Sequence, residues 1–130
     1  MTTRVPFYYT SGTLNSGTPA IVPINPPAGA TWELNYFKVV MNTGTTAGTR
    51  FIAIELSNED ILCWTGSQTA VSSTFNATTS PYNNAASSGG QGFIIRENLL
   101  IPSGTGLQLS LGLLPGDTAI AVFWGYTVWP

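Results

Sequence analysis

The chain of 130 residues is long enough for one domain, and its 43% hydrophobic and 12% aromatic residues can build a packed core. Only 8% of the residues are charged, against about 25% in an ordinary soluble domain, and the net charge of −2 argues against a basic surface for nucleic acid. With no His and a single Cys, His-based catalysis, intrachain disulfides and Cys-rich zinc sites are excluded, so we expect no enzyme, no cofactor and no metal site.

Short segments rich in β-branched and aromatic residues alternate with turns that contain most of the 14 Gly and 9 Pro residues, which predicts an all-β domain. No window keeps the apolar spacing of a helix without a Gly or Pro interrupting it. The expected strands, in chain order, are Arg4–Thr10, Ala20–Ile24, Thr31–Met41, Arg50–Leu56, Ile61–Trp64, Thr69–Phe75, Phe93–Arg96, Leu99–Ile101, Gly106–Leu113 and Ala119–Trp129. They predict a single-domain antiparallel β-sandwich, in the first instance a jelly roll, with a Greek-key sandwich of immunoglobulin-like type as the alternative.

The beginning of the chain is expected to differ from the rest. Pro6 interrupts the first strand and has no N–H to donate to a neighbour, so residues 1–10 are predicted to be an N-terminal arm or an edge strand. Residues 11–130 then form the sandwich. No apolar run follows the basic Arg4, and no stretch approaches the roughly 20 apolar residues that span a bilayer. We therefore expect a protein made in the cytoplasm, with no membrane partner.

Two kinds of strand follow from the side-chain pattern. Leucines alternate with small or polar residues in Gly106–Leu113, which predicts one buried and one solvated face. In Thr31–Met41 and Ala119–Trp129, large apolar residues occupy both faces. Such strands are either central between two layers or part of a subunit interface.

The side chains that could take part in catalysis or metal binding do not form a recognisable site. The carboxylates are Glu33, Glu55, Glu59, Asp60, Glu97 and Asp117. No spacing among them singles out a catalytic pair, and Glu59, Asp60 and Asp117 fit ordinary turns. Lys38, the only lysine, is expected to solvate a strand face or to form an ion pair. Cys63 is expected to be a small buried hydrophobe.

The chain ends and one long loop are the candidate contact regions. Aromatic side chains give much contact area for a small loss of conformational entropy. Those near the chain ends pack onto their own domain, onto a neighbouring subunit or onto sugar rings; they are Phe7, Tyr8, Tyr9 and Trp129. The uncharged stretch Ser80–Gly92 is a flexible loop or a contact loop. These alternatives stay open at the level of the sequence.

The last third of the chain resembles small virion proteins of tailed bacteriophages. The resemblance lies in a Leu-Pro-x-Gly strand entry, a following alternating strand, a turn with Gly-Asp and a closing aromatic strand. These features correspond to Leu99–Gly104, Leu107–Leu109, Leu113–Thr118 and Phe123–Trp129, and a similar first hairpin covers Ala30–Leu34 and Arg50–Ile54. The resemblance extends from about Ala30 to Trp129.

The resemblance implies a capsid decoration, or cement, protein. Such proteins are β-sandwich or jelly-roll units, often trimeric, so a homotrimer is expected here. They bind the exterior of the virion head and stabilise contacts between subunits of the major capsid protein. On this hypothesis the arm Thr2–Thr10 and the loop Ser80–Gly92 reach the shell, and Phe7, Tyr8, Tyr9 and Trp129 make capsid or subunit contacts. A phage tail or fibre component and a non-catalytic carbohydrate-binding module are the alternatives.

Overall fold

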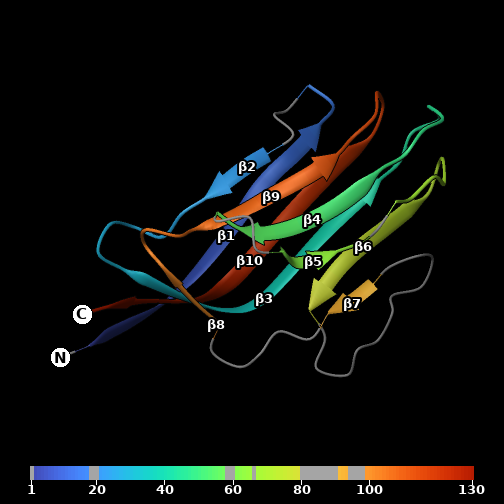
Figure 1. Ribbon diagram of the computed structural model, residues 1–130. Coiled ribbons are helices and arrows are strands. Elements are labelled where there is room, and N and C mark those ends of the chain that lie inside the picture. The colour runs from blue at the N-terminus through green and yellow to red at the C-terminus, as the bar shows by residue number, and fades with distance from the viewer. Residues whose placement is uncertain (1, 18–20, 58–60, 66, 80–90, 94–98) are drawn as a thin grey trace.

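The computed structural model describes residues 2–17, 21–57, 61–65, 67–79, 91–93 and 99–130, and of residues 21, 22, 61–63, 79 and 91–93 it describes the backbone. In this part of the chain two β-sheets pack face to face and no helix is present (Figure 1). The predicted all-β sandwich is therefore confirmed. The described residues contain no helix that could cross a membrane.

The larger sheet, sheet A, is built around three long strands. Its strand order is β1-β10-β3-β6-β7, and β8 pairs with β3 beside β6. All its pairs are antiparallel except β6 with β7. The strands are β1 (Thr3–Asn15), β3 (Thr31–Asn42), β6 (Thr74–Thr79), β7 (Gln91–Phe93), β8 (Leu99–Pro102) and β10 (Thr118–Trp129). The first and last strands pair along their length, so the two termini lie side by side (Figure 1).

The smaller sheet, sheet B, has the order β2-β9-β4-β5 and is wholly antiparallel. Its strands are β2 (Ile21–Ile24), β4 (Phe51–Leu56), β5 (Ile61–Trp64) and β9 (Leu107–Gly112). In β9 the three leucines are buried and the residues between them are partly exposed, as the alternation predicts.

The core lies between the two sheets. Sheet A contributes Leu34, Phe37, Val39, Met41, Ala121 and Phe123, and sheet B contributes Ile52, Ile54, Leu107, Leu109 and Leu111. The long strands β3 and β10 are central in sheet A, and sheet B covers only their inner side. Their outer side chains, apolar as well, therefore remain at the surface of this chain.

Both neighbours of β10 contain a β-bulge. In β3, Asn35 is the extra residue, because Trp124 pairs with Tyr36 and Gly125 pairs with Leu34. Before the bulge the even-numbered residues of β3 face the core, and after it the odd-numbered residues do. A second bulge lies between Thr10 and Thr13 of β1, where Gly12 has a φ of 66°. It lets β1 continue to Asn15, beyond the predicted end at Thr10.

One of the expected strands differs in position, and another lies mostly outside the described residues. The prediction of a strand at Thr69–Phe75 is wrong, since residues 69–72 are exposed and the strand begins at Thr74. Ser72 has a φ of 49°, which interrupts an extended backbone. The strand predicted at Phe93–Arg96 is observed at Gln91–Phe93, and residues 94–96 lie outside the described part, as do residues 80–90 of the expected loop.

Candidate interaction face

The outer surface of sheet A, which we name face A, is the largest set of exposed apolar side chains among the described residues. Alternation along each strand, counted from the buried residues, determines its members. They are Arg4, Pro6, Tyr8, Thr10, Thr13 and Asn15 of β1, Thr118, Ile120, Val122, Trp124, Tyr126 and Val128 of β10, Thr31, Glu33, Tyr36, Lys38, Val40 and Asn42 of β3, Leu100 and Pro102 of β8, and Thr74, Asn76 and Thr78 of β6. Tyr8 is 66% exposed, Leu100 57%, Ile120 44% and Trp124 41%.

Three aromatic rings cross the middle of face A. Tyr8 pairs with Trp124, and Trp124 pairs with Tyr36, so the three side chains lie on adjacent strands at one level. The Trp124 and Tyr36 centroids are 3.8 Å apart with 15° between the planes, and those of Tyr8 and Trp124 are 6.4 Å apart. Thr78 of the next strand donates a hydrogen bond to the Tyr36 hydroxyl at 3.2 Å. The aromatic row thus spans β1, β10 and β3, and a hydrogen bond links it to β6.

The orientation of these rings limits what they can bind. Tyr36 and Trp124 stack face to face across neighbouring strands, so their ring planes stand upright on the sheet and present their edges to solvent. A sugar ring stacks on an open aromatic face, and the sides of Tyr36 and Trp124 that face each other are closed by their stack. Upright edges can instead interdigitate with side chains of another protein surface.

Face A carries few charges, and most of them are already paired. Arg4 donates from Nε and Nη2 to the two carboxylate oxygens of Glu33 at 3.2 and 2.9 Å. The same guanidinium lies 3.7 Å above the ring centroid of Tyr126. Lys38 is exposed, and it forms no ion pair with another described residue. The face is therefore close to neutral and apolar.

The four aromatic residues predicted from the sequence do not share one surface. Phe7 faces inward and stacks on Trp32, with centroids 4.6 Å apart and 12° between the planes. Tyr9 also faces inward and packs at a tilt against Phe123. Tyr8 is the residue that lies on face A, and Trp129 is 37% exposed near the end of β10. An arm or an edge strand was expected at the start of the chain, and residues 3–10 belong to β1, at the edge of sheet A.

Sequence reasoning missed Trp124 and Tyr36 as the centre of the candidate site. Trp124 was visible as an outward residue of a strand with two apolar faces, and that pattern is the signal that points to it. Tyr36 was hidden because the bulge at Asn35 shifts the alternation of β3 by one residue. The partner of Arg4 was not predictable either, since Glu33 is 29 residues away in the chain.

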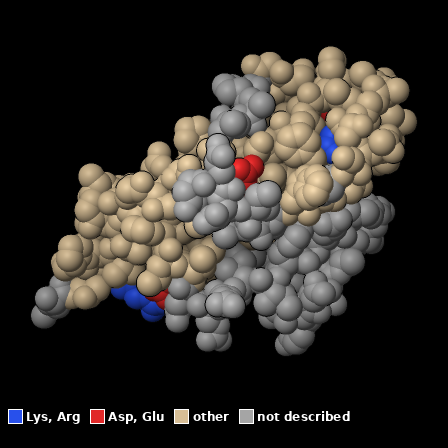
Figure 2. All heavy atoms as spheres, in the orientation of Figure 1, with Lys and Arg blue, Asp and Glu red and all other residues tan. Residues whose placement is uncertain are grey.

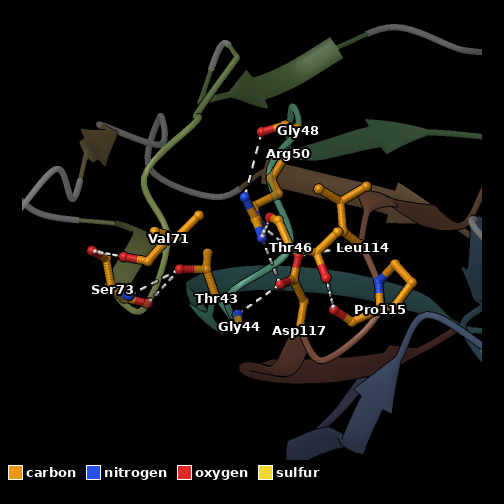
Figure 3. A network of polar contacts seen from close by, with 10 residues as sticks. All are labelled: Thr43, Gly44, Thr46, Gly48, Arg50, Val71, Ser73, Leu114, Pro115 and Asp117. Atoms are coloured by element: carbon orange, nitrogen blue, oxygen red, sulfur yellow. Dashed lines mark hydrogen bonds and ion pairs between the residues drawn. The ribbon is translucent and has the colours of Figure 1, made fainter.

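A second polar cluster, which we name the clamp, lies buried at the end of the sandwich where β4 and β10 begin (Figure 3). Arg50 donates to both carboxylate oxygens of Asp117, from Nε at 2.7 Å and from Nη2 at 3.0 Å. Nη2 also donates to the carbonyl oxygen of Thr46 at 2.7 Å. Asp117 accepts further hydrogen bonds from the backbone N–H groups of Gly44 and Leu114, at 2.8 and 2.9 Å. Both side chains are 0% exposed.

The clamp joins three loops. The hydroxyl of Thr46 donates to the carbonyl of Pro115, which links the β3–β4 loop to the β9–β10 turn. The N–H of Ser72 donates to the carbonyl of Gly44, which holds the segment before β6 against the same loop. Asp117 was predicted as a turn residue, and its N–H does donate to the carbonyl of Leu114 across the β9–β10 turn. The prediction missed that its carboxylate is buried and joins the two sheets through Arg50.

The protonation of Asp117 is controlled by this environment. Burial by itself would raise the pKa of the carboxyl group. The hydrogen bonds from Arg50 and from the N–H groups of Gly44 and Leu114, together with the charge of Arg50, outweigh burial and lower the pKa below its usual value. With its acceptors occupied, Asp117 has a structural position and no opening toward a substrate.

The remaining candidate residues do not converge. No group of three or more His, Cys, Asp or Glu residues that could hold a metal ion occurs in the described ranges. Glu55 lies on the outer side of sheet B, far along β4 from the clamp. Glu59, Asp60 and Glu97 lie outside the described residues. Cys63 is in β5, and its side chain, whose burial was predicted, is not described.

No protein-family model, curated protein or solved structure was found to match this chain.

Proposed function

We propose that the chain is a structural protein of a tailed-phage virion, a decoration or cement protein that binds the exterior of the head. In this role it would stabilise contacts between subunits of the major capsid protein. The function is mechanical, so it needs no catalytic group, cofactor or metal. Its partners are other protein surfaces, without nucleic acid or membrane.

The observation that carries the proposal is face A. Four large apolar side chains on it are more than two-fifths exposed, and its few charges are largely neutralised. A soluble monomer rarely exposes a continuous apolar patch of this kind, so the face is best explained as a contact surface for protein. The view in Figure 2 also contains only small patches of charged atoms among the described residues, as suits close and repeated packing.

The strand order supports the fold that the resemblance implies. We propose that the sandwich is a jelly roll, in which β1-β10-β3-β6 and β2-β9-β4-β5 are the two four-stranded layers. In this arrangement the first and last strands lie side by side, and the chain crosses repeatedly between layers. A rigid roll of this type can act as a plug over a junction between capsid subunits.

Face A does not favour the carbohydrate-binding alternative. A glycan module needs aromatic faces that lie open to solvent, and here Trp124 is covered by Tyr36 on one side and approached by Tyr8 on the other. A tail or fibre component would use the same apolar surface, and copy number separates it from a decoration protein.

The test is the copy number of the chain in purified particles of the virus whose genome encodes it. Quantitative mass spectrometry would compare its peptides with those of the major capsid protein. A count close to one per capsid subunit, or one set of three per three-fold site, is the expected result. A handful of copies would replace the proposal by a tail or connector role, and absence from the particle would overturn it.

A further inference from the structure

We propose that face A binds face A of a second copy of this chain, forming a two-fold symmetric pair with the aromatic row at its centre. This inference rests on the function proposed above, because both assign protein contacts to face A. It adds the identity of one partner and the register of the contact. The sheet packing would be face to face, with the strands of the two copies running in opposite directions.

The size of face A suits a stable pair. Strands β3 and β10 each contain 12 residues. Such strands are about 40 Å long, and four adjacent strands are about 19 Å wide, which gives roughly 760 Å² for one side of a contact. A standard protein–protein interface buries about 800 Å² on each partner. The exposed face is therefore as large as a specific dimer requires.

The register follows from the level of the aromatic row. On β10, Trp124 lies midway between Tyr126, which pairs with Glu33, and Val122, which pairs with Lys38. A two-fold axis in the interface plane, perpendicular to the strands at the level of Trp124, exchanges these two levels. Lys38 of one copy then lies opposite Glu33 of the other, and the same contact is repeated by symmetry.

The same operation matches apolar residues with apolar residues. Val122 of one copy faces Tyr126 of the other, and Ile120 faces the level of Val128, two pairs deduced from positions on one regular strand. Lys38, which makes no ion pair with another described residue of its own chain, then lies near the carboxylate of Glu33, which Arg4 already binds in its own chain. The match of apolar residues thus fits a second copy in this register.

A pair fits the surface better than the homotrimer implied by the resemblance. A three-fold ring needs two different patches that match each other, whereas a two-fold contact uses one patch on both subunits. Half of the exposed large hydrophobic residues of the described chain lie on face A: Tyr8, Leu100, Ile120 and Trp124. The others, Val5, Trp64, Val71 and Trp129, are on other surfaces.

The first experiment measures the mass of the isolated full chain by light scattering and by sedimentation over a range of concentrations. We expect a dimer that dissociates on dilution. Trp124→Ser should raise the dissociation constant at least about 30-fold, as expected for a central aromatic residue of an interface. Trp64→Ser is the matched control, since Trp64 is 54% exposed on sheet B, and it should leave the dissociation constant unchanged.

Two further variants keep the test decisive if Trp124→Ser disturbs the fold. Ile120→Glu places a charge on an outward side chain of face A that is 44% exposed, and it should also produce a monomer. Glu33→Gln and Lys38→Gln are then combined in a double-mutant cycle. Within one chain they are roughly 13 Å apart, so independent effects on dimerisation are expected unless they meet across the interface. We expect each to weaken the dimer about threefold and the double variant to weaken it no further.

Each outcome is informative. A monomer at all concentrations, a trimer, or a dimer insensitive to Trp124→Ser and Ile120→Glu would overturn the proposal. Additive effects of Glu33→Gln and Lys38→Gln would overturn the register. Because these measurements use the isolated chain, a dimer that is absent from virus particles would remove the proposed function and leave the pairing intact. A chain that is present in virus particles but monomeric in isolation would remove the proposed pairing and leave the proposed function intact.

Discussion

At the scale of single residues, Gly125 shows how one missing side chain organises a sheet. It lies in the middle of β10 opposite the bulge of β3. A Cβ at this position would overlap the backbone carbonyl of Glu33. Phe7 of β1 pairs with Gly125, and the Phe7 ring stacks on Trp32 of β3.

Gly125→Ala is therefore expected to lower the free energy of unfolding by about 3 kcal/mol or more, because backbone has to move. Denaturant unfolding of the purified variant measures this loss. Gly104→Ala is the control, since a Cβ there meets nothing within 4 Å and its φ is ordinary. Equal stability of the two variants would show that β10 and β3 adapt without strain.

Asp117→Asn leaves the buried guanidinium of Arg50 without its counter-charge. We expect a loss of about 3–5 kcal/mol in the free energy of unfolding. Glu33→Gln, which alters a similar two-pronged pair with a half-exposed Arg4, should cost about 1 kcal/mol or less. Urea unfolding of both variants compares a buried pair with a surface pair, and similar losses would contradict the structural role of the clamp.

The clamp also predicts a pH dependence. The pKa of Asp117 is lower in the folded than in the unfolded chain, where it is about 3.9, so the unfolded chain binds the proton first as the pH falls. The stabilisation is complete well above the unfolded pKa and is lost as the pH falls from about 4 through the folded pKa. Urea unfolding between neutral and acidic pH should show this loss, and Asp117→Asn should flatten it. An unchanged pH profile in the variant would contradict it.

At the scale of elements, strand β1 has two unlike faces. Phe7 lies against Trp32 on the inner side, and Tyr8 lies on face A. Phe7→Ala should therefore destabilise the monomer by about 2 kcal/mol, while Tyr8→Ala should cost less than about 1 kcal/mol. Thermal unfolding at low protein concentration distinguishes them, and the opposite ranking would mean that the two faces of β1 are assigned wrongly.

Most elements were predictable because their signals are local. Alternation identified β9 with its buried leucines, and two-sided apolar runs identified β3 and β10. The strand at Thr74–Thr79 was misplaced because its core residues, Phe75 and Ala77, are few and the preceding Val71 suggested an earlier start. The length of β1 was underestimated because Gly12 reads as a turn, although here it forms a bulge.

At the scale of the whole molecule, the candidate site depends on long-range pairing that sequence cannot supply. Alternation predicts that Tyr8 points to one side of β1 and that Phe7 and Tyr9 point to the other, but it does not say which side faces the core. Trp124 and Tyr36 meet only because β10 and β3 pair in one register. Arg50 and Asp117, 67 residues apart, are joined by the same kind of distant pairing.

The low charge of the molecule predicts weak salt dependence. If face A pairs through apolar contacts with a reciprocal Lys38–Glu33 contact, raising the salt from about 0.05 to about 0.5 M should change the dissociation constant less than about threefold. Analytical ultracentrifugation across this range measures it. A steep weakening with salt would show that charge dominates the association.

The bulge at Asn35 has a consequence for how the gene can vary. Strand β3 is in effect two segments of opposite phase, joined by one residue that faces solvent. Without that residue the whole of β3 would have a single alternation. Either Trp32 and Leu34 or the group Phe37, Val39 and Met41 would then point outward. Point changes at Asn35 should be mild, whereas an in-frame deletion there should be as damaging as the loss of half the core.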